Sequence, residues 1–257
     1  MKQPVIIIGL GEMGGVFARA FLRQGYPVQP VVRGDNLAEM ANTIPEPALA
    51  LVAVGEADLH ATLENIPAAW RSSIVLLQNE LLPHDWQRHG IQTPTVISVW
   101  YEKKPGQDVK IIVPSPVYGP LADIVDASLA TLKIPCHILH NEAQLLFELI
   151  RKNVYILTTN IAGLIAGGTV AILWQQHNSL ARDVANDVID IQDWLSNQQS
   201  DREALIDAMV AAFDGDPEHR CMGRSAPARL ANALRLADQA QLDVPTLRKI
   251  AAETRAQ

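Results

Sequence analysis

Residues 4–26 read PVIIIGLGEMGGVFARAFLRQGY, and this stretch decides the fold. Val5–Gly9 is an apolar run of the kind that forms a short buried strand. Met13–Gln24 has apolar residues at the spacing of an amphipathic helix, and Gly25 after it is a common helix stop. A strand, a glycine-rich turn and a helix in this order are typical of the start of a nucleotide-binding α/β domain.

The turn between these two elements has the pattern G-x-G-x-x-G, formed by Gly9, Gly11 and Gly14. In a Rossmann domain the first glycine permits the tight turn, the second lets the backbone approach a pyrophosphate, and the third allows close helix–strand packing. The helix N-terminus adds unpaired N–H groups and a partial positive charge. A plain strand–turn–helix without a ligand is the alternative. The predicted cofactor-binding residues of this turn are Gly9, Leu10, Gly11, Glu12, Met13 and Gly14.

The first half of the chain continues to alternate strand-like and helix-like segments, which indicates a parallel sheet covered by helices. The further predicted strands are Val28–Val32, Ala50–Val54, Ile74–Gln78, Thr95–Trp100, Lys110–Val113 and Cys136–Leu139, and the further helices are Asp58–Trp70 and Asp123–Leu132.

Beyond about residue 141 only helical periodicity remains. The predicted helices are Glu142–Ile165, Ser179–Leu195, Asp201–Phe213, Ala226–Gln239 and Pro245–Ala252. The predicted fold class is therefore α/β: an N-terminal Rossmann-type doubly wound sheet in residues 1–141, followed by an all-helical C-terminal domain in residues 142–257. We expect the second domain to serve substrate binding and dimerisation.

The end of the second predicted strand bears on the choice of cofactor. An acid at this place hydrogen-bonds the ribose hydroxyl of NAD, whereas an arginine accommodates the 2′-phosphate of NADP. The sequence there is PVVRGDN, in which Arg33 comes first and Asp35 follows two residues later. Because Arg33 is nearer the strand end and has no adjacent acid, we predict NADP, with NAD as the less favoured cofactor. An exposed loop cation is the alternative for Arg33.

Composition excludes some classes of partner. The chain has 257 residues, of which 48% are hydrophobic, and a formal net charge of −7. An acidic protein is a poor ligand for phosphate backbones, so we expect no nucleic-acid partner, and we interpret Lys103 and Lys104 as solvated loop charges. The two cysteines, Cys136 and Cys221, are too few for a disulfide framework; we expect free thiols and a cytoplasmic location.

Residues 153–181 contain no Asp, Glu, Lys or Arg and are numerous enough to span a bilayer. Polar residues and glycines, among them Asn160, Gly167 and Gly168, interrupt the stretch, and Gln175, Gln176 and His177 close it. We therefore predict a buried helix followed by a glycine-rich loop, and no membrane association.

Several segments together resemble the ketopantoate reductase family, within the wider 6-phosphogluconate-dehydrogenase-like superfamily. The resemblance covers most of the chain. It is carried by GLGEMGG, the spacing to Arg33, IVLLQNE with its Asn79, SPVYGP, RKNVYILTTNIAGL and ADQAQLDVPTLRKI. The segment SPVYGP is similar to a turn of that family, and RKNVYILTTNIAGL is similar to the helix that carries its catalytic lysine and an asparagine.

The resemblance implies roles for three residues. Lys152 would be the general acid, Asn160 would orient the substrate, and Asn79 would lie where nicotinamide ribose and substrate meet. Reduction of a ketone leaves a developing alkoxide, which needs a proton and a positive charge, and a lysine ammonium supplies both. Each has a plainer alternative: a surface charge for Lys152, a structural hydrogen bond for Asn160, and a strand end for Asn79.

The chain departs from the family pattern at several positions. Ile156 stands where the family has a second asparagine on the lysine helix, and Ser225 stands where it has a substrate-binding glutamate. Gly55 and Glu56 replace a second basic residue that assists NADP binding in the family. Because a pocket that hydrogen-bonds a hydroxyl discriminates strongly, these changes indicate a different substrate. Arg224, Arg229 or His219 could instead bind a substrate carboxylate.

Two other clusters are interpreted as structural. Cys136 and His140 would share a face of a strand and His137 would point away, so we predict no metal site there. Asp183, Asp187 and Asp190 recur at helical spacing opposite an apolar stripe, so we interpret them as a solvated face.

Two hypotheses follow. The first is an NADP-dependent oxidoreductase that reduces a small 2-keto acid or related carbonyl, with Lys152 as proton donor. For this enzyme a homodimer is the expected assembly. The second is a non-catalytic dinucleotide-binding sensor or assembly protein with a degenerate substrate site.

Overall fold

The computed structural model describes residues 2–255, which form two compact units. The first ends at Glu148 and the second begins at Leu149. Helix α6 (Glu142–Ala166) starts in the first unit and continues in the second. The predicted boundary, after residue 141, falls at the start of this helix, whereas the internal contacts divide the chain within it. The predicted fold class, an α/β sheet followed by a helical region, is confirmed.

The first unit is built on a seven-stranded sheet with the order β2-β1-β3-β4-β5-β8-β9. Its strands are β1 (Val5–Ile8), β2 (Val28–Val31), β3 (Leu49–Val52), β4 (Ile74–Leu76), β5 (Thr95–Ile97), β8 (Ser115–Tyr118) and β9 (Cys136–Ile138). The first five strands are parallel, β8 runs antiparallel to β5, and β9 is parallel to β8. Because β1, β2 and β3 are parallel, their carboxyl ends lie at one edge of the sheet. The strand order changes direction between β1 and β3, and ligands bind beside such a point in sheets of this kind.

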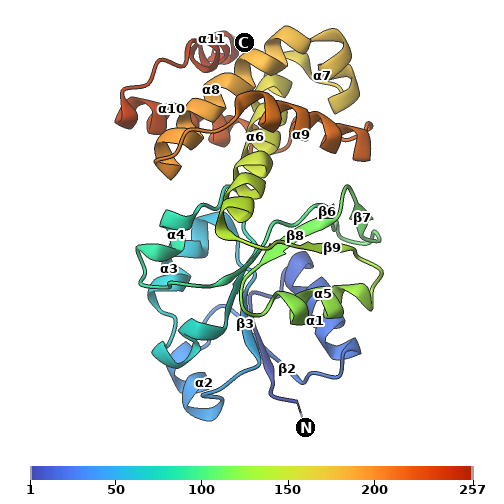
Figure 1. Cartoon of the computed structure of the whole chain (residues 1–257), viewed down its shortest axis with the longest axis vertical. Helices are drawn as coiled ribbons and strands as arrows, with labels where there is room; N and C mark the ends of the chain where they lie inside the picture. The colour runs from blue at the N-terminus through green and yellow to red at the C-terminus, as the bar shows by residue number, and fades with distance from the viewer. Residues whose placement is uncertain (1, 256–257) are drawn as a thin grey trace. The chain divides into compact units, whose positions relative to one another are not determined.

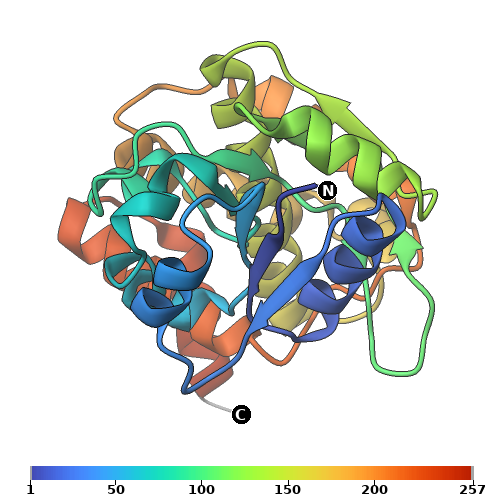
Figure 2. The ribbon, with the colours of Figure 1, turned by 90° about the horizontal axis from the view of Figure 1, so that it is seen from below.

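Helices cover both faces of the sheet (Figures 1 and 2). Helices α1 (Glu12–Arg23) and α5 (Ala122–Ala130) pack on one face, where Phe17, Phe21 and Leu129 are fully buried in the main core cluster. Helix α3 (Leu59–Glu64) and the 3₁₀ helix η2 (Ala68–Ser73) lie on the other face, where Leu63 and Trp70 are fully buried. Burial of such large apolar side chains is the main force that holds helices on a sheet.

Five segments differ from the sequence prediction. The segment SPVYGP is not only a turn, because its first four residues form strand β8. Lys110–Val113 contributes only the two-residue strand β7 (Lys110–Ile111), which pairs with β6 (Tyr101–Glu102) in a separate hairpin. Asp58–Trp70 divides into α3 and η2, and the short helices α2 (Leu37–Thr43) and α4 (Pro83–Gln87) were not predicted.

The second unit is helical, as predicted. It continues α6 and adds α7 (Val170–Gln176), α8 (Asn178–Ser196), α9 (Arg202–Gly215), α10 (Ala226–Ala240) and α11 (Pro245–Arg255). Helix α8 is central and packs against the other four added helices. Gly167 and Gly168 form the predicted loop after α6, both with positive φ, but α7 follows at once instead of further loop. No helix in residues 2–255 is long and apolar enough to cross a membrane.

Asp187 corrects one prediction, because it is not part of a solvated face. Its side chain is buried, and its Oδ2 accepts hydrogen bonds from the backbone N–H groups of Thr246 at 2.8 Å and Leu247 at 3.0 Å. It thereby caps the N-terminus of α11 from a different helix, a contact between residues far apart in sequence. Asp183 is exposed as predicted, and Asp190 forms an ion pair with Arg202.

Candidate functional site

The glycine turn follows β1 and has the steric properties predicted for it. Gly9 has φ +97°, and a Cβ added there would lie 2.8 Å from the carbonyl oxygen of Ala53. A Cβ added at Gly14 would lie 2.1 Å from the carbonyl oxygen of Gly9. Both positions therefore require glycine, the first for its backbone conformation and the second for the close packing of α1 on β1.

Gly11 is glycine for a different reason. An added Cβ there would meet no atom within 4 Å, so packing within the protein does not require a glycine. Gly11 is the N-cap of α1 and provides no side-chain cap, so the first N–H groups of this helix have no intrahelical partner. Open space beside unpaired N–H groups and a helix N-terminus is what a phosphate group needs. The turn therefore fits the pyrophosphate of a dinucleotide.

A groove of about 930 Å³ runs along this edge of the sheet. Its walls come from the glycine turn, the loop after β2, the end of β3 and helix α3. Among the predicted cofactor residues, Gly9, Leu10, Gly11 and Arg33 line it. Thr62 of α3 also lines the groove, as do Asp58 and Asn65, which lie directly before and after this helix. The sequence did not predict this contribution, because the segment carries no motif for this role.

Arg33 lies at the mouth of the groove with its side chain 92% exposed. It has no acid adjacent in sequence, but Asp58 is 3.4 Å from its guanidinium and partly offsets its charge. Asp35, the residue that would favour NAD, turns its Oδ2 back to the N–H of Val32 at 2.8 Å. The Asp35 carboxylate is therefore hydrogen-bonded within its own loop. The Arg33 guanidinium is held by an exposed ion pair, and such pairs are weak.

Asn79 follows β4 and is partly buried. Its amide Nδ2 donates to Oε1 of Glu56 at 2.9 Å, so the segments that follow β3 and β4 contact each other. The neighbouring Gln78 is buried and donates to the carbonyl oxygens of Val52 at 2.7 Å and Val54 at 3.2 Å. Gln78 therefore fixes the strand ends, and Asn79 is positioned at the same edge as the glycine turn.

Lys152 and Asn160 both lie on α6, within the second unit. The side chain of Lys152 is buried, with 6% exposure, in a helix that is otherwise mostly apolar. Asn160 is 9% exposed; its Nδ2 donates to the carbonyl of Ile156 at 2.8 Å, and its Oδ1 accepts from the N–H of Gly223 at 3.4 Å. Asn160 therefore has structural partners, and burial of a lysine such as Lys152 is costly unless its charge is paired.

The positions that depart from the family pattern also have defined places. Ile156 lies between Lys152 and Asn160 at intervals of four residues, so the three share one stripe of α6. Ser225 is the N-cap of α10 and makes no side-chain capping bond. Of the residues considered for a carboxylate, Arg224 is exposed and His219 packs beside the ring of Tyr155.

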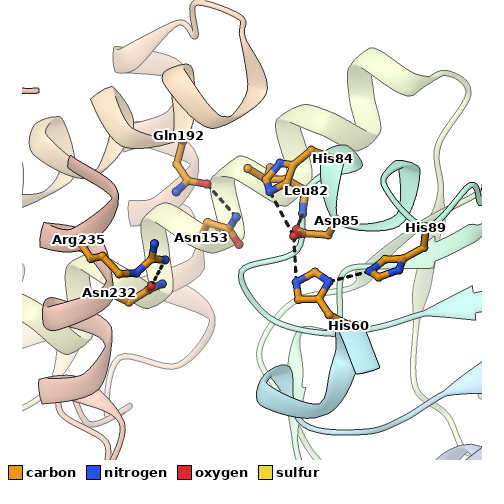
Figure 3. Close-up of polar contacts among 9 residues, drawn as sticks. All are labelled: His60, Leu82, His84, Asp85, His89, Asn153, Gln192, Asn232 and Arg235. Atoms are coloured by element: carbon orange, nitrogen blue, oxygen red, sulfur yellow. Dashed lines mark hydrogen bonds and ion pairs between the residues drawn. The ribbon is translucent and has the colours of Figure 1, made fainter. Parts of the chain in front are cut away.

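A polar cluster on α3 and α4 of the first unit was not predicted from the sequence (Figure 3). The carboxylate of Asp85 lies between two imidazoles, 3.5 Å from His60 and 3.2 Å from His84, and His60 also contacts His89 at 3.2 Å. The other carboxylate oxygen of Asp85 accepts a hydrogen bond from the N–H of Leu82 and so caps α4. The cluster fixes α3 against α4. Within residues 2–255, no group of three or more His, Cys, Asp or Glu is arranged to hold a metal ion.

Lys103 corrects another prediction. It is not a solvated loop charge: its side chain is 22% exposed, and its ammonium lies 2.9 Å from Oε2 of Glu12 in the glycine turn. Lys104 is the more solvated of the pair, with 62% exposure and an ion pair to Glu102 within the same hairpin. A sequence gives no signal for such a contact, because it depends on where the β6–β7 hairpin lies.

Together, these features define a chain with a Rossmann-type first unit and a helical second unit. The same arrangement occurs in solved ketopantoate reductases, so the resemblance predicted from the sequence is confirmed at the level of the fold. No protein-family model matches the sequence, and a search of curated proteins finds no match.

Three solved structures illustrate the similarity. A 2-dehydropantoate 2-reductase from Methylococcus capsulatus is 14% identical, with a TM-score of 0.68 over 98% of this chain and 96% of the other. A dimeric ketopantoate reductase from Staphylococcus aureus is 17% identical, with a TM-score of 0.67 over 98% of both chains. D-mandelate dehydrogenase in complex with NADH is 15% identical, with a TM-score of 0.66 over 100% of this chain and 98% of the other.

Proposed function

We propose that the protein is a cytoplasmic reductase that uses NADP and acts on a small 2-keto acid or a related carbonyl compound. The observation that carries this proposal is the glycine turn: Gly9 and Gly14 are required sterically, and Gly11 leaves open space beside the N-terminus of α1. The groove that continues from this turn to Arg33 supports an adenine dinucleotide rather than an isolated phosphate.

NADP is proposed over NAD because of the two side chains after β2. Arg33 offers an exposed guanidinium, which suits a 2′-phosphate, while Asp35 is engaged with the loop backbone. The ion pair with Asp58 reduces the advantage of Arg33 for a phosphate. We therefore expect a preference for NADP, but not exclusion of NAD.

For the chemistry, the proposal assigns each of this chain's residues one task. When bound, the cofactor supplies a hydride to the carbonyl carbon. The ammonium of Lys152 stabilises the negative charge on the carbonyl oxygen and gives it a proton, leaving an alcohol and a neutral amine that regains its proton from solvent. Asn79 orients the ribose and substrate, and Asn160 keeps Gly223 in place through its Oδ1. The enzymes of similar fold support a keto-acid substrate and a homodimer as parts of the proposal.

The test is oxidation of NADPH by the purified protein with ketopantoate and a panel of other 2-keto acids, with NADH in parallel. Turnover that is faster with NADPH supports the proposal. Absence of binding by both cofactors would contradict the assignment of the glycine turn itself.

A second function, a non-catalytic dinucleotide sensor, is favoured by two observations. Ile156 and Ser225 replace groups that bind substrate in the resembled family, and the amide of Asn160 is engaged by the backbone. Tight binding of NADPH with no turnover across the panel would select this function over the first.

A further inference from the structure

The β6–β7 hairpin brings a lysine to the glycine turn. Lys103, directly after β6, places its ammonium 2.9 Å from the Glu12 carboxylate, and the same ammonium donates to the carbonyl oxygen of Lys104 at 2.8 Å. The hairpin lies beside α1 in both views of the ribbon (Figures 1 and 2). This contact joins two parts of the first unit that are remote in sequence.

The position of Lys103 is fixed by the core. Trp100 and Tyr101, which precede it, are buried, with exposures of 2% and 4%. The N–H of Trp100 donates to the hydroxyl of Ser115 at 2.9 Å, and its carbonyl accepts from Ile112 at 2.9 Å. The backbone that leads to Lys103 is therefore anchored, and this holds its ammonium within reach of the Glu12 carboxylate.

Glu12 is an unfavourable residue for a phosphate-binding turn. It follows Gly11 and is the first residue of α1, so its negative charge belongs to the same helical turn whose N-terminus would attract an anion. An acid stabilises a helix N-terminus, but the same negative charge repels a pyrophosphate that occupies this place. The turn therefore needs a compensating cation if it is to bind a dinucleotide.

We propose that Lys103 is a positioning residue that sets the affinity of the glycine turn for a dinucleotide by balancing the charge of Glu12. The inference rests on the proposed function, because it concerns the same turn. Lys104 offers a matched comparison: it is the adjacent lysine, but it pairs with Glu102 of its own hairpin and does not contact the turn.

The test compares the Kd for NADPH of single and double variants, measured by calorimetry on the full chain. Lys103→Ala is expected to weaken binding about tenfold at low salt, since it leaves one uncompensated charge near the phosphates, and the loss is expected to shrink in high salt. Lys103→Arg should retain most of the affinity, and Lys104→Ala should bind like the wild type. In the Glu12→Gln/Lys103→Ala double variant, affinity should return to within about twofold of the wild type.

The outcomes separate this inference from the proposed function. If the wild type binds NADPH and the Lys103→Ala variant binds it with equal affinity, this inference is overturned and the proposed function is not. A double variant as weak as Lys103→Ala also overturns it, because the lysine would then act on the ligand directly. Wild-type protein that binds no dinucleotide contradicts the proposed function and this inference with it. Thermal melting of each variant shows whether a loss reflects unfolding.

Discussion

The glycine turn of the first unit and helix α6 of the second differ in whether their polar groups have hydrogen-bond partners within the protein. At the turn, the space beside Gly11 is open and the first N–H groups of α1 have no intrahelical partner. On α6, the amide of Asn160 is bonded to Ile156 and Gly223, and Asn153 donates to Gln192 at 2.8 Å in the core, as Figure 3 shows. The first arrangement leaves groups for a ligand, whereas the second uses them within the protein. Of the polar residues on α6, Lys152 is the one to which the proposed function assigns proton transfer.

The largest expected effect is that of replacing Lys152. Lys152→Met keeps an unbranched apolar stem and removes the ammonium, so we expect turnover of any accepted carbonyl substrate to fall by about 10²–10⁴-fold. The Kd for NADPH should not change, because the turn and groove of the first unit are intact. Steady-state kinetics and calorimetry on the same preparation measure both quantities.

Lys249→Met is the matched control, because Lys249 is 77% exposed on α11. It should leave turnover unchanged. Equal turnover in Lys152→Met and the wild type would show that α6 contributes only structure, and the comparison would then favour the non-catalytic function.

The second prediction tests whether close packing requires glycine in the turn, and it compares two adjacent glycines of α1. Gly14→Ala introduces a Cβ 2.1 Å from the Gly9 carbonyl, so the helix must shift. We expect a loss of about 1–3 kcal/mol in the free energy of unfolding and a fall of about 100-fold in NADPH affinity. Gly15→Ala meets nothing within 4 Å and should stabilise the helix by about 0.5–1 kcal/mol. Urea unfolding and calorimetry check both; similar effects from the two changes would contradict the packing argument.

The same contrast explains what the sequence could predict. Strand β1, the glycine turn and α1 were recognisable because local rules determine them. These rules are an apolar run, a helical period, and glycine at Gly9 and Gly25, where the backbone has positive φ. The long helix with Lys152 and Asn160 was predictable for the same reason. Strand β8 was not, because Pro116 and Gly119 near its ends resemble turn residues and only its pairing with β5 makes it a strand.

Contacts between distant segments account for the other differences. The pairs Arg33–Asp58 and Lys103–Glu12 each join residues from separate elements, and neither leaves a mark in the local sequence. The three histidines around Asp85 lie on α3, on α4 and just after α4, elements whose packing no periodicity predicts. Asp187 had the spacing of a solvated face, but the N-terminus of α11 covers it. Such residues become recognisable only once the fold is known.

Asp187 gives the third prediction, in the second unit. Asp187→Ala leaves two N–H groups of α11 without an acceptor and should cost about 1–2 kcal/mol of unfolding free energy. Burial raises the pKa of the Asp187 carboxyl above its usual value of 3.8, although hydrogen bonds from Leu247 and Thr246 oppose this, and Asp190 and Asp183 raise it further. Because the folded state holds this proton more tightly than the unfolded state, the contribution of this group to stability falls as the pH rises through its folded pKa.

Asp187→Asn tests the sign of that effect. The amide keeps an acceptor oxygen for α11 and carries no charge, so its stability relative to the wild type should improve as the pH rises from about 4 to 7. Asp183→Asn, at an exposed position of the same helix, should show no such trend. Urea unfolding at several pH values measures it, and a relative stability of Asp187→Asn that falls with pH would contradict the burial of the carboxylate.

The smallest expected effect concerns the histidine cluster, which joins α3 to α4 through His60 and Asp85. Burial lowers the pKa of His60 below its usual value of 6.5; Arg88, His89 and His84 lower it further, and Asp85 opposes them. A depressed pKa in the folded state means that the unfolded chain binds the proton more readily. The contribution of His60 to the free energy of unfolding is therefore present above about pH 6.5. It is lost as the pH falls through the pKa that His60 has in the folded state.

His60→Gln should therefore lose less stability than the wild type between pH 7.5 and about pH 5, while His137→Gln, at an exposed position on β9, should follow the wild type. Urea unfolding at the two pH values gives the comparison. If NADPH affinity of the wild type also falls over this range and that of His60→Gln does not, the cluster supports the geometry of the strand ends that carry Asn79 and Glu56. An equal loss of stability on acidification in His60→Gln and the wild type would show instead that the contact among His60, Asp85 and His89 does not control the pH dependence of this unit.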